Sequence, residues 1–89
     1  MENKQQHLIK KLLYVSQHRG MKESDVLIGG FARAHLHTMT IPELEAWEGL
    51  LQENDNDLID WLFDRKPRPL GAHGGLLDRL YADVKDKLE

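Results

Sequence analysis

Apolar residues recur every three or four positions along most of this chain, which is the spacing of one face of an α-helix. The first such stripe consists of Leu8, Ile9, Leu12 and Leu13. Gly20 follows it after two basic residues, and glycine adopts at little cost the left-handed backbone that ends many helices. The pattern therefore predicts a first amphipathic helix that ends at about Gly20.

A second helix is expected directly after Gly20. Glu23 and Asp25 would lie in its first turns, where carboxylates are favoured by the exposed backbone amides. Two adjacent glycines, Gly29 and Gly30, lie inside this segment, and each costs a helix about 1 kcal/mol relative to alanine. They suggest the close approach of a neighbouring helix or of a partner's backbone. The inward stripe is expected to consist of Leu27, Phe31 and Ala34.

The start of a third helix is marked by Thr40, Pro42 and Glu43. Thr40 can cap the helix, proline is tolerated in the first turn, and a glutamate three residues after the cap completes a capping box. The predicted apolar face of this helix consists of Leu44, Trp47, Leu50 and Leu51.

The remaining pattern predicts two more helices. A polar turn at 54–57 can cap a short apolar helix that runs to Phe63 and is expected to be buried on more than one side. The Lys-Pro-Arg-Pro sequence at 66–69 ends that helix, and a flexible connector is expected at 71–75. A final amphipathic stripe consists of Leu77, Leu80, Tyr81, Val84 and Leu88.

No segment alternates in the way a strand does, so the fold class predicted is all-α, as a small antiparallel five-helix bundle. Its 89 residues are expected to form one helical domain, 1–89, with a modest core. The net charge of −3 argues against a general affinity for nucleic acid. No apolar run is long enough to span a membrane and no secretory signal is present, so a cytoplasmic location without membrane insertion is expected.

Candidate catalytic and metal-binding groups are few. The chain has no cysteine, which excludes disulfides and thiolate chemistry. His35 and His37 are two residues apart and would point to different faces of a helix, so no metal site is expected. No sequence context supports an activated serine, so we expect no catalytic residue and no enzyme. The aromatic residues Trp47, Trp61 and Phe63 are expected to serve core packing rather than a ligand pocket.

The heptapeptide Arg-Gly-Met-Lys-Glu-Ser-Asp at 19–25 places one cation and two carboxylates at the junction between the first two helices. By local rules, Arg19 complements the end of one helix, Gly20 is its cap and Glu23 favours the start of the next. Loops held by rigid elements often carry function, so a binding role fits the same residues equally well.

This heptapeptide resembles the signature of the succinate dehydrogenase assembly factor 2 family, also called FAD assembly factors or flavinylation factors. The likeness continues in the Asp-Asn-Asp-Leu-Ile-Asp-Trp-Leu sequence at 55–62 and covers residues 8–63. His18 and Ser24 depart from the family pattern, in which arginine and leucine are common at these positions. Residues 64–89 match nothing specific, which leaves the role of the last helix open.

The resemblance implies a five-helix fold and an assembly factor that binds the flavoprotein subunit of succinate dehydrogenase, or of the related fumarate reductase. The resemblance further implies that such a factor promotes covalent attachment of FAD, with the bond formed by a histidine of the flavoprotein itself. By matching position, Arg19, Gly20 and Glu23 would form the partner-binding surface, with Asp25 beside them. Gly20 would permit close approach, while Arg19 and Glu23 would make charge-assisted hydrogen bonds to the partner.

The alternative function is a regulatory protein-interaction module, such as the antitoxin of a membrane-associated toxin system. No tightly bound cofactor is expected, and the sequence leaves open whether the chain itself binds FAD. The protein is expected to be a monomer.

Overall fold

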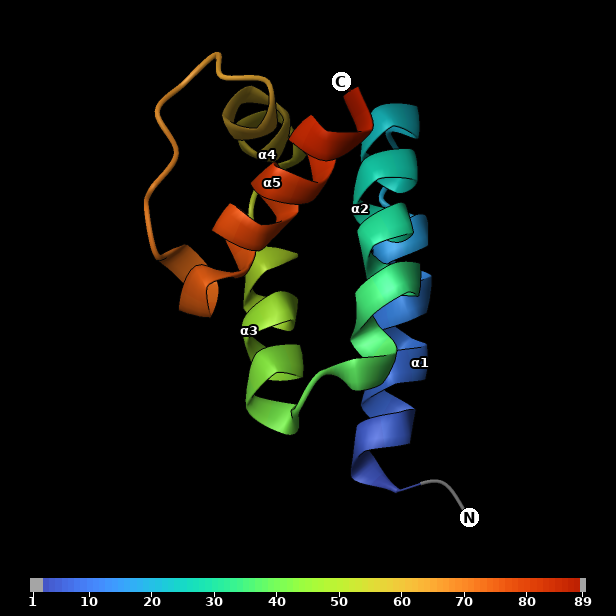
Figure 1. Ribbon diagram of the computed structural model, residues 1–89. Coiled ribbons are helices and arrows are strands. Elements are labelled where there is room, and N and C mark those ends of the chain that lie inside the picture. Colours follow the sequence, from blue (N-terminus) through green and yellow to red (C-terminus); the bar gives the residue numbers. More distant parts are fainter. Residues whose placement is uncertain (1–2, 89) are drawn as a thin grey trace.

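The computed structural model describes residues 3–88, which form five α-helices and two short 3-10 helices (Figure 1). The α-helices are α1 (Lys4–Gln17), α2 (Lys22–His35), α3 (Ile41–Leu50), α4 (Asp55–Leu62) and α5 (Leu76–Leu88). The 3-10 helices are η1 (Leu36–Thr38) and η2 (Ala72–Gly75). No strand occurs among the described residues, and the predicted all-α class is confirmed.

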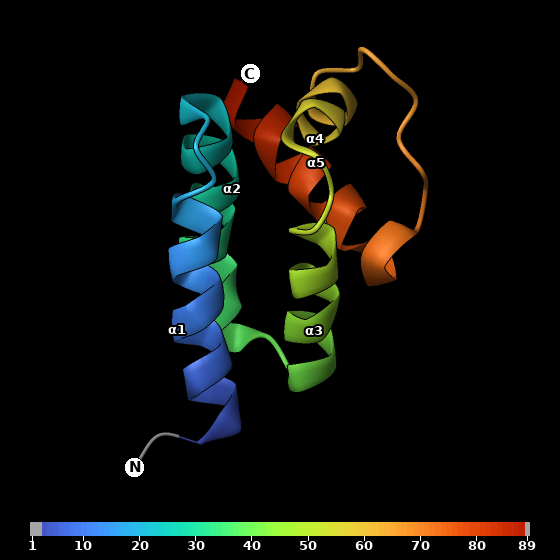
Figure 2. The same cartoon turned by 180° about the vertical axis from the view of Figure 1, so that it is seen from behind.

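The first three α-helices follow an up-and-down order. Helices α1 and α2 pack side by side as an antiparallel hairpin, and α3 runs back alongside them after η1 (Figures 1 and 2). Helix α4 lies beyond the end of α3, and α5 crosses the molecule obliquely, in contact with α2, α3 and α4. The antiparallel arrangement expected for five helices therefore describes only α1 to α3.

One hydrophobic core receives side chains from all five α-helices. At its centre, the fully buried Trp47 stacks on Phe31, with 5.0 Å between the ring centroids. The indole N–H of Trp47 donates a hydrogen bond of 3.0 Å to Oγ of Ser16, which is also fully buried. The polar atom of the largest core side chain is thus satisfied. Other core residues include Leu12, Ile28, Leu44, Leu58, Leu62, Leu77, Leu80 and Val84.

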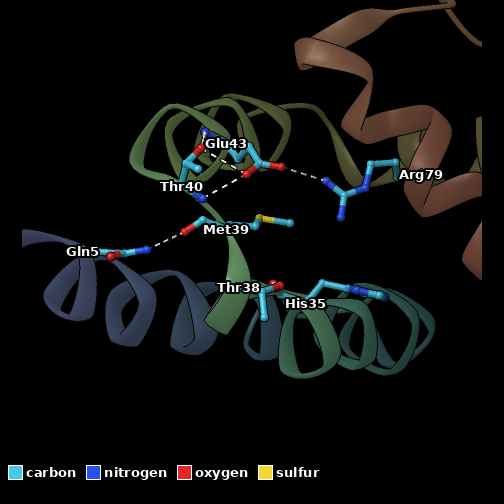
Figure 3. Close-up of polar contacts among 7 residues, drawn as sticks. All are labelled: Gln5, His35, Thr38, Met39, Thr40, Glu43 and Arg79. Carbon is cyan, nitrogen blue, oxygen red and sulfur yellow. Dashed lines mark hydrogen bonds and ion pairs between the residues drawn. The ribbon is translucent and has the colours of Figure 1, made fainter.

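The capping box predicted at the start of α3 is confirmed. The hydroxyl of Thr40 accepts a hydrogen bond from the backbone N–H of Glu43 at 3.3 Å, and Glu43 accepts one from the backbone N–H of Thr40 at 2.9 Å. Arg79 of α5 reaches the second carboxylate oxygen of Glu43 at 3.2 Å (Figure 3). The Thr40 N–H and hydroxyl, followed by Arg79, hold the pKa of Glu43 below its usual range.

Two predictions about α1 and α2 are wrong in detail. Helix α1 ends at Gln17 with His18 as its C-cap, three residues before Gly20, although Gly20 does adopt the expected positive φ of 99°. Ala34 is exposed, because the buried face of α2 is centred on Ile28, Phe31 and Ala32.

The C-terminal part differs from the sequence prediction in three places. Helix α4 ends at Leu62, before the prolines. The expected flexible connector contains η2 and is tied to α5, because Asp78 accepts hydrogen bonds of 2.9 Å from the backbone N–H of Gly71 and from Nε of Arg68. These two groups, that of Gly71 first, lower the pKa of Asp78. Leu88 is 57% exposed, whereas Leu76, which the pattern missed, is buried.

The two glycines of α2 have different surroundings. A Cβ on Gly29 would lie 2.9 Å from Cγ of Gln17 and 3.4 Å from the carbonyl oxygen of Ser16, both on α1. A Cβ on Gly30 would meet only the terminal nitrogen of Lys87, at 3.0 Å. Of the two explanations for this glycine pair, the close approach of a neighbouring helix therefore accounts for Gly29.

Substituting each glycine by alanine should consequently have opposite effects. Gly29→Ala should lower the free energy of unfolding by about 1–3 kcal/mol, because the Gln17 side chain, close to its attachment on α1, must shift to admit the methyl group. Gly30→Ala should leave it unchanged or raise it by up to about 1 kcal/mol, because alanine favours the helix and the Lys87 side chain can move away. Urea unfolding measures both values, and equal changes for the two variants would contradict the proposed helix contact.

The two fully buried serines allow a second comparison. Ser16 accepts the hydrogen bond from Trp47, whereas the hydroxyl of Ser24 has no hydrogen-bond partner within residues 3–88. Ser16→Ala should lower the free energy of unfolding by about 1–3 kcal/mol, since it leaves a buried N–H unsatisfied. Ser24→Ala should be neutral or stabilising, since it removes a buried hydroxyl that gains nothing. A larger loss for Ser24→Ala in thermal unfolding would refute this reading.

Candidate functional site

The backbone between α1 and α2 turns at Gly20, at the end of the helical hairpin (Figure 2). Its φ of 99° is a conformation that side-chain-bearing residues rarely adopt. Gly20 is exposed, and no described atom outside its immediate chain neighbours lies within 4 Å of the position that a Cβ would take. The backbone here is therefore open to solvent and accessible to another molecule.

The side chain of Arg19 points inward from this junction and is only 9% exposed. Its Nε donates to Oδ1 of Asp55 at 2.6 Å, Nη1 to the carbonyl oxygen of Leu51 at 2.7 Å, and Nη2 to that of Glu53 at 2.9 Å. Carbonyl groups at the end of a helix lack partners within the helix, and Leu51 is the C-cap of α3. The planar guanidinium donates to this carbonyl group and to that of Glu53 in the following turn. Arg19 thus joins the α1–α2 junction to the turn between α3 and α4.

Asp25 holds the backbone of the same arginine. Its Oδ1 accepts a hydrogen bond of 2.7 Å from the backbone N–H of Arg19, and its side chain is half-buried. Asp25 and Asp55 therefore fix Arg19 at its backbone and at its guanidinium. The backbone directly before Gly20 is therefore held by two carboxylates, one bound to the N–H of Arg19 and one bound to its side chain.

Glu23 has a different environment. It lies in the first turn of α2, it is exposed, and it has no hydrogen bond or ion pair within the described part of the chain. The structure therefore brings all four predicted site residues together but divides them by orientation. Gly20 and Glu23 face solvent, whereas Arg19 and Asp25 make their hydrogen bonds within the protein.

Asp55 is a residue of this site that sequence reasoning missed. The sequence predicts that the polar turn at 54–57 caps a helix, and Asn54 does cap α4, because its side chain accepts a hydrogen bond of 2.7 Å from the N–H of Asn56. The carboxylate of Asp55 instead binds Arg19, 36 residues earlier in the chain. No local pattern signals a contact over that separation.

A groove beside Glu23 was also missed. It has a volume of about 390 Å³ and is lined by Lys22, Glu23, Val26, Leu27 and Phe63. Val26 is 60% exposed, and Phe63 is the C-cap of α4, so the groove lies between α2 and the end of α4. The only sequence signal for this groove is Val26, an apolar residue one helical turn after Glu23.

The described residues also show where the candidate metal-binding and nucleophilic side chains lie. Within residues 3–88, no three His, Asp or Glu side chains gather in a way that could hold a metal ion. Of the two buried serines, Ser16 accepts a hydrogen bond from an indole, and the hydroxyl of Ser24 has no base beside it in the described chain. None of the described helices is both long and apolar enough to cross a membrane.

Comparison with known proteins identifies the family. Residues 10–84 match the Sdh5 family, described as the flavinator of succinate dehydrogenase, and the chain belongs to this family. The resemblance noted from the motifs at 19–25 and 55–62 is thus confirmed. The match also includes most of α5, which the resemblance did not cover.

Named relatives agree with this assignment. The chain is 42% identical over 76 residues to the FAD assembly factor SdhE of Acetobacter pasteurianus, covering 85% of this chain and 70% of the relative. It is 42% identical over 62 residues to the mitochondrial succinate dehydrogenase assembly factor 2 of Dictyostelium discoideum, covering 70% and 44%. For the protein of that name from Danio rerio, the identity is 36% over 80 residues, covering 88% and 51%. The chain therefore spans about half the length of these two mitochondrial relatives.

The Arg19 contacts predict a stability effect that depends on the guanidinium. Arg19→Lys keeps the charge but cannot reach all three acceptors in one plane, so the free energy of unfolding should fall by about 1–3 kcal/mol. Arg65→Lys is the matched control, because Arg65 is 65% exposed and its contact with Asp60 is long, at 3.9 Å. This control should change stability by less than about 0.5 kcal/mol in urea unfolding. Equal losses would mean that the three contacts of Arg19 contribute no more than a surface ion pair.

Proposed function

We propose that this protein is an assembly factor that binds the flavoprotein subunit of succinate dehydrogenase and promotes the covalent attachment of FAD to it. The observation that carries this proposal is the family match over residues 10–84, which includes the junction and the turn that Arg19 joins to it. The relatives named as FAD assembly factor and as succinate dehydrogenase assembly factor support it. In this proposal the bond to the flavin is formed by the flavoprotein, and the present chain supplies no reacting group.

Such a factor acts by differential binding. A protein that binds the conformer competent for flavin attachment more tightly than other conformers raises the population of that conformer. A preference of about 2.7 kcal/mol raises the population ratio about 100-fold. A rigid surface suits this task, because little ordering free energy is lost on binding.

The contacts proposed for the partner follow from the orientation of the four site residues. Gly20 and Glu23 are proposed to touch the flavoprotein, Gly20 through its open backbone and Glu23 through charge-assisted hydrogen bonds to a basic side chain. Arg19 and Asp25 are proposed to serve the same surface by holding its backbone, since their hydrogen bonds are made inside the protein. This assigns to Arg19 a positioning role in place of the direct contact expected from the sequence.

The flavoprotein subunit of fumarate reductase is proposed as a second partner of the same surface, and the chain is proposed to act as a monomer in the cytoplasm. The absence of a nucleic-acid partner stays a prediction from the net charge of −3.

The site assignment is tested by Gly20→Arg. This variant should abolish binding to the purified flavoprotein subunit in calorimetric titration, because a long side chain would occupy the approach to the backbone. Arginine at a φ of 99° also carries strain, which costs of the order of 1–3 kcal/mol. Gly71→Arg is the matched control, since Gly71 has a φ of 76° and an equally open Cβ position but lies in the loop between α4 and α5.

The control should bind normally and keep its helical circular dichroism. Covalent flavin fluorescence of the flavoprotein subunit, compared between the native host and a strain that lacks this gene, tests the function itself. Undiminished flavin attachment without the gene would refute the proposed function. Normal binding by Gly20→Arg would refute only the site.

A further inference from the structure

The groove between α2 and the end of α4 is continuous with the exposed part of the junction, because Glu23 belongs to both. Its lining is apolar at Val26, Leu27 and Phe63, and its exposed rim carries Lys22 and Glu23. Leu27 and Phe63 also pack against the core, whereas Val26 projects its side chain into solvent. The result is an open apolar hollow bordered by one cation and one carboxylate.

The charges at the rim are available to another molecule. Neither Lys22 nor Glu23 has a hydrogen bond or ion pair with any residue in the range 3–88, although most other charged side chains of the molecule do. An apolar hollow with unpaired charges of both signs fits a polypeptide segment better than it fits a lipid or a nucleic acid. Such a segment would present an apolar side chain between a basic and an acidic one.

From this arrangement we infer that the groove receives an apolar side chain of the flavoprotein subunit, next to a basic side chain that pairs with Glu23. The inference rests on the proposed function and extends its contact surface from the junction to Phe63. A partner that reaches Gly20 and Glu23 also lies beside Val26, one helical turn further along α2. Burial of the exposed valine then adds apolar contact to the polar contacts of the junction.

The walls of the groove are held at a fixed spacing by the same contact that fixes the junction. One wall belongs to α2, which follows the junction, and the other is Phe63 at the end of α4. Arg19 at the junction binds Asp55, the first residue of α4. The groove is therefore formed before a partner arrives, which lowers the cost of binding.

Substitution of Val26 tests the inference with little risk to folding, because this side chain is largely exposed. Val26→Lys should weaken binding to the purified flavoprotein subunit at least about tenfold, since it places a charge in the hollow. Val26→Ala removes two methyl groups and should weaken binding about three- to tenfold. The control is Ala34→Lys, because Ala34 is exposed and lies near the other end of α2. The dissociation constant of this variant from the flavoprotein subunit should stay within about twofold of the wild-type value.

The outcomes separate the two proposals. An unchanged dissociation constant for Val26→Lys, together with loss of binding by Gly20→Arg, would overturn the groove contact and leave the proposed function standing. Equal weakening by Ala34→Lys would show a general effect of added charge and would also overturn it. If sedimentation showed that the wild-type chain dimerises and that Val26→Lys does not, the occupant would be a second copy and the inference would be wrong. A wild-type chain that does not bind the subunit would overturn both proposals.

Discussion

The arrangement of this protein depends on one guanidinium group. The side chain of Arg19 enters a nearly closed site at the α1–α2 junction. It binds the carbonyl groups of Leu51 and Glu53, which follow α3, and the carboxylate of Asp55, which begins α4. Without it, these acceptors would be partly buried and would lose the donor that satisfies them, which costs free energy. The arginine therefore determines how the two halves of the fold meet on this side.

The surface that is proposed to face a partner follows from that constraint. Because the side chain of Arg19 is directed inward and Asp25 binds its backbone, the next residue, Gly20, is presented on an immobilised peptide. Glu23 and Val26 then follow on the exposed side of the first turns of α2, and Phe63 completes the groove from α4. Binding groups on a preformed backbone lose little conformational entropy when a partner docks. This is the physical requirement for a factor that acts by selecting one conformer of another protein.

The C-terminal helix has the packing role that its apolar stripe predicts, although the family motifs read from the sequence did not extend to it. Leu76, Leu77, Leu80 and Val84 are buried in the common core, and Asp78 ties the preceding loop to α5. The family match to residue 84 agrees with this, because the core of a chain this small is incomplete without α5.

The sequence by itself determined the features that depend on neighbours within one helical turn. The amphipathic stripes predicted the all-α class, Thr40 and Glu43 predicted the start of α3, and the position of Gly20 predicted its left-handed backbone. The sequence also placed the candidate site at the junction, through its motifs. It could not show which site residues face outward, because Arg19 meets Asp55 across 36 residues and no local pattern encodes such a contact. The tertiary structure alone decided that orientation, together with the groove between α2 and α4 and the close packing of Gly29 on α1.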